Sequence, residues 1–233
     1  MTPILFYGVP SGCSFGAIVA LEWLAEPYRL CRIQMPETVS GEDFRRINPV
    51  AQTPAYVTSA GDVVAESMAI GNHIAARGIG RQLGHPQGSR QFDRLNQMLA
   101  YLNTSFFNAF GPLWHVLEHE LGSQAKAALT DYGRAQVQKT HAMLDKLLGP
   151  QQWLLGEQRS VADAYFAGIA RWADYHQAID RRDYPNLLRL YDALQADPAV
   201  QFAHRIEARQ AAQSAGGYQG QIELAEALAL LAP

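Results

Sequence analysis

The segment Ile47-Asn-Pro-Val-Ala-Gln-Thr-Pro-Ala55 places a Thr-Pro pair directly before a short apolar stretch that is expected to be a strand. Proline is tolerated at the first residue of a strand, and X-Pro bonds adopt the cis form far more often than other peptide bonds. A cis bond at Pro54 would leave the N–H and C=O of Thr53 free on an open edge, where an extended peptide can pair as an extra strand. The alternative is a trans proline that opens an ordinary edge strand.

Glu66-Ser67 follows the next expected strand, at the point where a helix is expected to begin. The Ser67 hydroxyl and the N–H groups after it are suited to hold a ligand carboxylate, and the Glu66 carboxylate is suited to meet an ammonium group. A γ-glutamyl group carries both charges. The alternative interpretation is that Ser67 caps the helix N-terminus.

The turn Pro10-Ser-Gly-Cys-Ser14 brings two candidate nucleophiles, Ser11 and Cys13, to the start of an apolar helix. Unpaired N–H groups and the positive end of the helix dipole lie there, so the pattern predicts a lowered pKa for the Cys13 thiol. In the alternative interpretation Cys13 is a small core residue and Ser11 or Ser14 is a helix cap.

Around these motifs the pattern predicts an α/β domain in residues 1–78, with a mixed four-stranded sheet flanked by helices. The predicted order is βαβ, then a helix, then ββα. The short apolar runs are typical of buried strands, and glycine, proline and small polar residues separate them. The expected strands are 3–7, 28–35, 55–58 and 62–65, and the expected helices are 14–24, 41–47 and 67–77.

A linker is predicted over residues 79–89, which are rich in glycine and polar side chains, and residues 90–233 are expected to form an all-α C-terminal domain. The tail after residue 209 contains Gly216-Gly217 and then a run of alanine and leucine. This run is expected to be either a docked helix or a frayed end. The expected helices of this domain are 91–120, 123–148, 160–173, 185–196 and 198–209.

Composition narrows the classes of function. With 19 Lys and Arg against 22 Asp and Glu, the net charge of −3 argues against nucleic acid as a partner. No segment has the length and apolarity of a membrane span, and the N-terminus lacks the pattern of a signal peptide. Two cysteines, Cys13 and Cys31, are too few for a disulfide framework, so the expected location is the cytoplasm.

Taken together, the motifs and their order resemble the glutathione S-transferase family, and the chain to about Arg209 looks most similar to the bacterial beta class. This resemblance implies a thioredoxin-like N-terminal domain, a helical C-terminal domain and a symmetric homodimer. Beyond the motifs quoted above, the matching stretches are Leu5-Phe-Tyr7, Val64-Ala-Glu-Ser-Met-Ala-Ile70, Asn108-Ala-Phe-Gly-Pro-Leu113, Ser160-Val-Ala-Asp-Ala-Tyr165 and Arg171-Trp172.

The resemblance also implies roles for single residues, with glutathione as substrate or cofactor. Cys13 matches the cysteine that contacts the glutathione sulfur, Thr53 matches the residue that pairs with the cysteinyl backbone, and Pro54 matches the family's cis proline. Gln52 matches a residue that helps to hold that backbone, and Glu66 with Ser67 matches the γ-glutamyl clamp. In the second domain the resemblance gives Ser160 and Asp163 the structural role of a helix capping box.

The sequence departs from the beta class where that class commonly presents a His-Lys pair, because Phe107-Asn108 stands there. The Ser-x-Cys turn also resembles the zeta class, whose members isomerise maleyl compounds with glutathione, although the arginine of that class is absent near Gly16. Three functions are therefore weighed: a glutathione transferase as the leading one, a glutathione-dependent isomerase, and a non-catalytic glutathione-binding protein.

A pocket for the second substrate, a small hydrophobic electrophile, is expected from the aromatic residues of the second domain. Ordinary helix core is the alternative for them. Tyr7 is interpreted as a packed ring with a satisfied hydroxyl, and the His-x-x-Glu-His run at 115–119 as a solvated helix face rather than a metal site. The aromatic candidates are Phe106, Phe107, Phe110 and Trp114.

Overall fold

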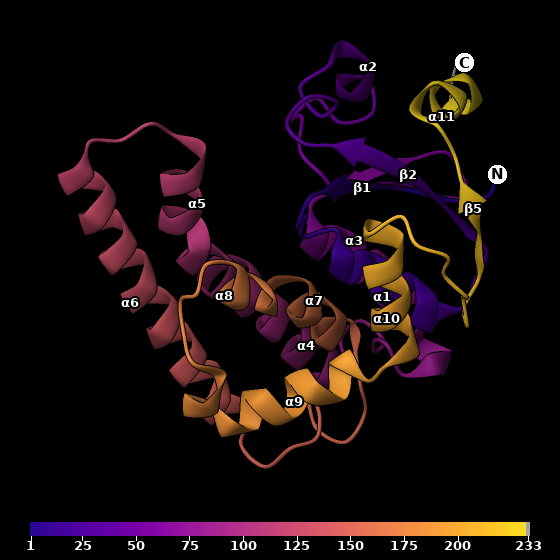
Figure 1. Ribbon diagram of the computed structural model, residues 1–233. Helices are drawn as coiled ribbons and strands as arrows, with labels where there is room; N and C mark the ends of the chain where they lie inside the picture. The colour runs from indigo at the N-terminus through magenta and orange to yellow at the C-terminus, as the bar shows by residue number, and fades with distance from the viewer. Residues whose placement is uncertain (232–233) are drawn as a thin grey trace.

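The computed structural model describes residues 1–231 and contains a sheet domain and a helical domain (Figure 1). The predicted βαβ-α-ββα order is confirmed, because the short apolar runs are strands and the longer ones are helices. The elements of the first domain are β1 (Ile4–Val9), α1 (Phe15–Leu24), β2 (Tyr28–Gln34), α2 (Glu42–Arg45), β3 (Ala55–Val57), β4 (Val63–Ala65) and α3 (Ser67–Arg77).

Strand β1 lies inside the sheet, which explains why all six of its residues are buried. It pairs in parallel with β2, through Ile4 with Arg29, and antiparallel with β3, through Ile4 with Val57. Strand β4 then pairs antiparallel with β3. The carboxyl end of β1 therefore leads directly into the turn that carries Cys13, beside the segment that enters β3.

Within residues 1–231 the sheet has five strands rather than the predicted four, in the order β4-β3-β1-β2-β5. The additional strand, β5 (Tyr218–Gln221), comes from the tail and pairs in parallel with β2. It is followed by α11 (Leu224–Leu231). Of the two alternatives for the tail, a docked helix is therefore correct and a frayed end is wrong. The tail thus lies on the first domain (Figure 1), although the boundary drawn from sequence assigns it to the helical one.

Glu22 attaches the tail to α1. Its carboxylate is only 5% exposed, and it accepts hydrogen bonds from the Ser214 hydroxyl at 2.7 Å and from the backbone N–H groups of Ala215 and Gly216. The Tyr28 hydroxyl donates to the same carboxylate at 2.7 Å. These donors compensate for the burial of the charge, and they fix the loop that leads into β5.

The second domain is helical, and two predicted helices are broken. Residues 160–173 were expected to be a single helix, but they divide at Arg171 into α7 (Val161–Ala170) and α8 (Trp172–Tyr175). Residues 91–120 were expected to be a single helix, but a π-helical turn interrupts them, and Gly111-Pro112 opens a new helix, because Pro112 has no N–H to donate to the preceding turn. No helix among residues 1–231 has the length and apolarity of a membrane span. The helical elements are η1 (Ile79–Arg81), α4 (Arg90–Tyr101), η2 (Leu102–Phe107), η3 (Asn108–Phe110), α5 (Gly111–Glu118), α6 (Ser123–Leu148), α7 (Val161–Ala170), α8 (Trp172–Tyr175), η4 (Arg181–Asp183), α9 (Pro185–Gln195) and α10 (Pro198–Glu207).

The two domains meet where α1 crosses α7. A Cβ atom on Gly16 would lie 2.5 Å from the carbonyl oxygen of Ala164, and one on Gly168 would lie 2.8 Å from the backbone nitrogen of Gly16. Both positions therefore require glycine if the helix backbones are to approach this closely. The crossing sets the distance between the Cys13 turn and the second domain.

Helix α7 begins with the expected capping box. The Asp163 carboxylate is fully buried and accepts hydrogen bonds from the N–H of Leu154 at 2.8 Å, the N–H of Ser160 at 2.8 Å and the Ser160 hydroxyl at 3.1 Å. It therefore joins the start of α7 to the loop before it.

We expect Asp163→Ala to lower the free energy of unfolding by about 3 kcal/mol, because two buried N–H groups would lose their acceptor. Chemical denaturation measures this difference. Asp93→Ala is the matched control, since Asp93 also lies in a first helical turn but is exposed; its expected effect is below about 1 kcal/mol. Equal losses in the two variants would contradict the role given to Asp163.

Candidate active site

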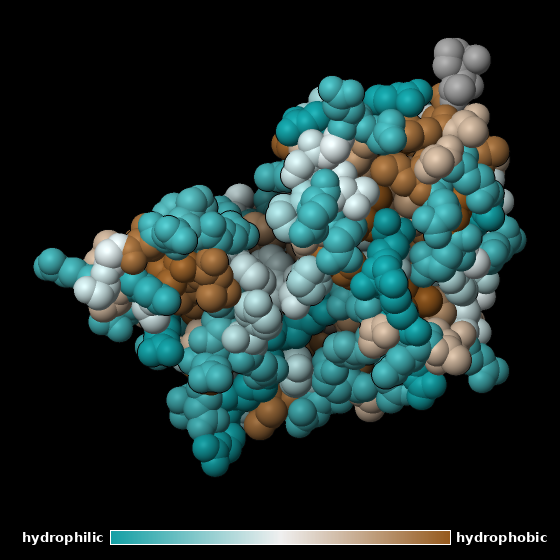
Figure 2. Space-filling model, turned by 45° about the horizontal axis from the view of Figure 1, so that its top comes forward, coloured by the Kyte–Doolittle hydropathy of each residue, from teal (hydrophilic) through white to brown (hydrophobic). Residues whose placement is uncertain are grey.

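A cavity of about 490 Å³ lies between the first domain and the segments η2 and α5 of the second. Figure 2 shows the surface hollowed between the first domain and the arm formed by α5 and α6. Seven of the residues singled out from the sequence lie in its wall, although they come from distant parts of the chain. They are Cys13, Gln52, Thr53, Pro54, Glu66, Ser67 and Phe107.

The turn that carries Cys13 is held from the second domain. Trp172 Nε1 donates to the carbonyl oxygen of Ser11 at 2.8 Å, and Arg171 Nη2 donates to that of Gly12 at 2.7 Å. Arg171 also forms an ion pair with Glu207, and both side chains are 13% exposed. Because two successive carbonyl groups are bound in this way, the backbone before Cys13 has a fixed orientation.

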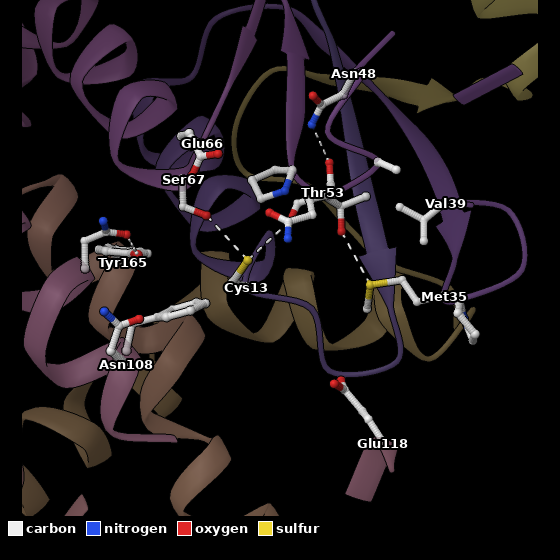
Figure 3. Close-up of a pocket in the computed structure, with 16 residues that line it drawn as sticks. Cys13, Met35, Val39, Asn48, Thr53, Glu66, Ser67, Asn108, Glu118 and Tyr165 are labelled. Atoms are coloured by element: carbon white, nitrogen blue, oxygen red, sulfur yellow. Dashed lines mark hydrogen bonds between the residues drawn. The ribbon is translucent and has the colours of Figure 1, made fainter. Parts of the chain in front are cut away.

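The Cys13 sulfur lies between two polar groups (Figure 3). The Ser67 hydroxyl donates to it at 3.5 Å, and its own S–H donates to the carbonyl oxygen of Thr53 at 3.4 Å. Burial raises the pKa of the thiol, and this effect outweighs the lowering by Ser67, the local backbone N–H and Arg171. The predicted low pKa is therefore wrong for the unliganded protein, which holds Cys13 as a neutral thiol.

The segment before β3 has the conformation that the Thr-Pro pair suggested, since the Thr53–Pro54 bond is cis. Within residues 1–231 the N–H of Thr53 makes no hydrogen bond, and its carbonyl oxygen accepts only from the Cys13 thiol. The Thr53 hydroxyl contacts Met35 Sδ at 3.6 Å. Asn48 Nδ2 donates to the carbonyl oxygen of Gln52 at 2.7 Å, which fixes the approach to this edge.

Glu66 and Ser67 lie on the same side of the cavity as Cys13 (Figure 3). Glu66 occupies the cap position of α3, and its backbone φ is 70°, a value that residues other than glycine rarely adopt. Ser67 is the first helical residue, and its hydroxyl faces the Cys13 sulfur. The interpretation of Ser67 as the helix cap is therefore wrong, and its side chain is directed into the cavity.

Ser11 does not lie in this cavity. It borders another hollow, with Arg32 and His204, on the other side of the turn. Its backbone φ of 53° turns the chain between Pro10 and Gly12, and its carbonyl group is the acceptor for Trp172. The structure thus separates the two candidate nucleophiles and leaves Cys13 as the one that faces the cavity.

The aromatic residues predicted for the second-substrate pocket divide into two groups. Phe106 and Phe110 are fully buried in the helical core, where they pack against the buried ring of His141. Trp114 packs against Trp172 and also lies outside the cavity. Only Phe107 of the four is in the wall.

Polar residues to which the sequence assigned no role in the cavity complete the wall around Phe107. The Tyr165 hydroxyl donates to Asn103 Oδ1 at 2.8 Å, and Glu118, at the end of α5, points toward the cavity from its edge (Figure 3). Asn48 has a detectable sequence signal, since Asn-Pro after a helix is typical of a turn. Asn108, Glu118 and Tyr165 stand in motifs quoted from the sequence, but these motifs indicated no role in the cavity. The residues without any such signal are Met35 and Asn103.

Tyr7 and the pair His115 and His119 lie outside the Cys13 cavity. Tyr7 is 1% exposed, and its hydroxyl accepts a hydrogen bond from Gln221 Nε2 at 3.1 Å, as expected for a packed ring. The rings of His115 and His119 stack at 4.1 Å on the surface. Among residues 1–231 no group of three or more His, Cys, Asp or Glu side chains is arranged to hold a metal ion.

Comparison with protein families identifies the class to which this fold and cavity belong. The N-terminal domain of glutathione S-transferases matches residues 1–76, and the C-terminal domain of glutathione S-transferases matches residues 95–198. The chain therefore belongs to the glutathione S-transferase family.

Individual relatives agree with this assignment. Glutathione S-transferase GstA of Escherichia coli O157:H7 is 27% identical over 72% of this chain and 81% of its own. Glutathione S-transferase GST-4.5 of Xanthomonas campestris is 26% identical over 86% of this chain and 97% of its own. A probable maleylacetoacetate isomerase of Drosophila melanogaster is 25% identical over 87% of each chain.

Solved structures that are similar to this chain are also glutathione S-transferases. A sphingomonad glutathione S-transferase complexed with glutathione is 28% identical, with a TM-score of 0.78, over 88% of this chain and 98% of its own. A bacterial beta-class enzyme from Sphingomonas chungbukensis is 25% identical, with a TM-score of 0.75, over 88% of this chain and 98% of its own. The similarity to the beta class noted in the motifs therefore extends to the fold.

The raised pKa of Cys13 can be measured by alkylation with iodoacetamide, because Cys31 is fully buried and will not react. We expect the rate to keep rising through pH 9 rather than to level off below it. In Ser67→Ala the thiolate loses a hydrogen-bond donor, so the pKa rises further and alkylation at pH 8 slows. Ser11→Ala should match the wild type; a wild-type rate that is already constant at pH 8 would contradict a raised pKa.

Proposed function

We propose that this protein is a glutathione transferase whose cavity binds glutathione between Thr53 and the pair Glu66-Ser67. The observation that carries the proposal is that one cavity combines the Cys13 thiol, the unpaired backbone edge of Thr53 and a polar end formed by Glu66 and Ser67. The cysteinyl backbone of glutathione would pair with the N–H and C=O of Thr53 as a short antiparallel strand. Its γ-glutamyl ammonium group would meet Glu66, and its carboxylate would meet the N-terminus of α3 at Ser67.

Binding in this position changes the environment of Cys13. The thiol donates to the Thr53 carbonyl in the unliganded protein, and this is the acceptor that the peptide would take over. The S–H of Cys13 would then lie beside the glutathione sulfur. When the glutathione thiol gives its proton to water, this S–H would donate a hydrogen bond to the resulting thiolate. A thiolate stabilised in this way at a defined position attacks the electrophile, and the leaving group departs with the electron pair of the broken bond.

The same arrangement supports thiol–disulfide exchange. In that reaction Cys13 loses its proton, attacks a glutathione disulfide and forms a mixed disulfide, while one glutathione leaves as the thiol. A neutral resting thiol makes this step slower at neutral pH than it would be for a low-pKa cysteine. We therefore rank conjugation above exchange.

The wall opposite glutathione argues for a second substrate that has a hydrogen-bonding group as well as an apolar part. Phe107 supplies an apolar surface, and Asn103, Asn108 and Tyr165 supply amide and hydroxyl groups. Glu118 at the mouth disfavours anionic electrophiles by repulsion. The small hydrophobic electrophile expected from the four aromatic residues is thus replaced by a more polar one.

The isomerase alternative loses one of its supports, because Ser11 of the Ser-x-Cys turn lies outside the cavity. The non-catalytic alternative rests on the missing His-Lys pair, and Asn108 in its place still offers a hydrogen-bonding side chain at the cavity. A substrate panel with an aryl halide, a disulfide and a maleyl ester tests both alternatives. Turnover of the maleyl ester alone would favour the isomerase, and no turnover of any substrate would favour the non-catalytic protein. Free thiols at Cys13 and Cys31 support a reducing compartment such as the cytoplasm.

The catalytic proposal predicts that Cys13→Ala lowers the conjugation rate with an aryl halide by about 100-fold, as the loss of one donor to a developing thiolate commonly does. Calorimetry with glutathione should still show binding, because Thr53, Glu66 and Ser67 remain. Ser11→Ala is the matched control and should retain full activity. No heat with millimolar glutathione in the wild type would contradict the binding mode; full activity in Cys13→Ala would contradict the role of the thiol.

We also propose that the protein is a homodimer that pairs the first domain of one subunit with the second domain of its partner. Met143 lies about three turns after Tyr132 on α6, and Leu147 lies about one turn after Met143, so the three side chains share one face of the helix. They are 56% (Tyr132), 49% (Met143) and 48% (Leu147) exposed. Val63, at the β4 edge of the first domain, is 43% exposed. Exposed apolar side chains of this kind, outside the buried face of the helix, are typical of an interface between subunits.

Light scattering should therefore give twice the chain mass of 25.7 kDa. Met143→Glu places a charge in the proposed interface and should shift the protein to the monomer at micromolar concentration. Leu117→Glu is the control, because Leu117 is 56% exposed but lies on α5. A monomeric wild type would contradict the proposal.

A further inference from the structure

The tail builds a second cavity on the other side of the first domain from α5. Strand β5 pairs only with the first half of β2, through Tyr28 with Tyr218 and Leu30 with Gln221, and the chain then turns into α11. Strand β2 continues to Gln34. A cavity of about 430 Å³ lies where the tail leaves this edge, and it shares no residue with the wall of the Cys13 cavity.

Three parts of the fold contribute to this cavity. The sheet supplies Tyr7 and Arg32, the end of α10 supplies Ile206 and then Arg209, and the tail supplies Tyr218 and Gln221. The family match ends at residue 198, so most of these walls lie beyond it. The volume is within the range of small-molecule sites.

Arg32 is the distinctive group in the cavity. Its Nη1 donates to the carbonyl oxygens of Ile206 at 3.4 Å and Glu207 at 3.0 Å and to the Tyr7 hydroxyl at 3.5 Å, but within residues 1–231 Arg32 forms no ion pair. Its buried Nε has no acceptor in this part of the chain. A buried donor without a partner is unfavourable by about 1–3 kcal/mol, so the site favours a ligand that supplies an acceptor.

The surrounding charges favour an anion. The Glu207 carboxylate is bound by Arg171 and is therefore neutralised. Glu223 borders the cavity as an acid, and Arg209 borders it as a second cation beside Arg32. The balance is one positive charge in excess, in a site that is partly shielded from water.

We propose that this cavity binds a small organic carboxylate with an aromatic or apolar body. The guanidinium fork of Arg32 matches a carboxylate in two parallel hydrogen bonds, and Nε is one of the donors that such a pair uses. Gln221 Nε2, which donates to the Tyr7 hydroxyl at 3.1 Å, and the Tyr218 hydroxyl offer further polar contacts. The body of the ligand packs against Ile206 and the ring of Tyr218.

Benzoate is the probe for this site, and benzamide is its uncharged counterpart. Calorimetry on the full chain, with glutathione present at saturation, should show one benzoate per chain and much weaker binding of benzamide. Arg32→Met should weaken benzoate by about 10- to 100-fold, the loss expected for hydrogen bonds to a charged group. Arg29→Met is the matched control, because Arg29 lies on the same strand and pairs with Glu226 outside the cavity.

Gln221→Leu keeps Arg32 and alters only the part of the cavity wall that the tail supplies. It therefore tests the proposal even if Arg32→Met does not fold. It also distinguishes this cavity from the neighbouring hollow that Arg32 shares with Gln34 and His204. We expect it to weaken benzoate several-fold and to leave the alkylation rate of Cys13 unchanged.

Five outcomes overturn the proposal. The first four are an absence of heat with millimolar benzoate, equal binding of benzamide, equal benzoate affinity in the wild type and both cavity variants, and binding of inorganic phosphate in preference to benzoate. Displacement of benzoate by glutathione would also overturn it, because the ligand would then belong to the Cys13 cavity. None of these results depends on whether the protein conjugates glutathione.

Discussion

The close crossing of α1 and α7 is the constraint on which the rest of the structure depends. Gly16 and Gly168 let the two backbones approach until added Cβ atoms would overlap main-chain atoms of the facing helix. At this separation Trp172 and Arg171 reach the carbonyl groups of the turn before Cys13. A wider separation would leave the turn without these donors, and the cavity would lose one of its fixed walls.

Burial then decides the chemistry of Cys13. The helix terminus, Ser67 and Arg171 all favour the thiolate, but desolvation of the sulfur outweighs them in the unliganded protein. The thiol instead donates to the Thr53 carbonyl, the group that an incoming peptide strand would use. Occupation of the backbone edge and release of the thiol are therefore coupled in the proposed mechanism. The tail is independent of this coupling, since it attaches through Glu22 and the free edge of β2.

Much of the fold could be predicted because its signals are local. Apolar runs, prolines at first-turn positions and the Ser160 capping box depend on residues close in the chain, and they located most helices and strands. Strand β5 was missed because Tyr218–Gln221 has no strand pattern of its own; pairing with the β2 edge makes it a strand. The second-substrate wall was predicted only in part, because Phe106 and Phe110 pack against α6 and α7, and only tertiary packing decides which side of their segment is buried.

By itself the sequence determined the class of fold, the family and four polar residues that surround Cys13, namely Gln52, Thr53, Glu66 and Ser67, because turn chemistry and motif order are properties of short segments. Tertiary structure alone decided that Ser11 and Cys13 face different cavities, that the Cys13 thiol is neutral and that the tail encloses Arg32. The physical reason is that pKa and cavity shape depend on desolvation and on which distant backbones meet, and neither quantity is encoded in any one segment.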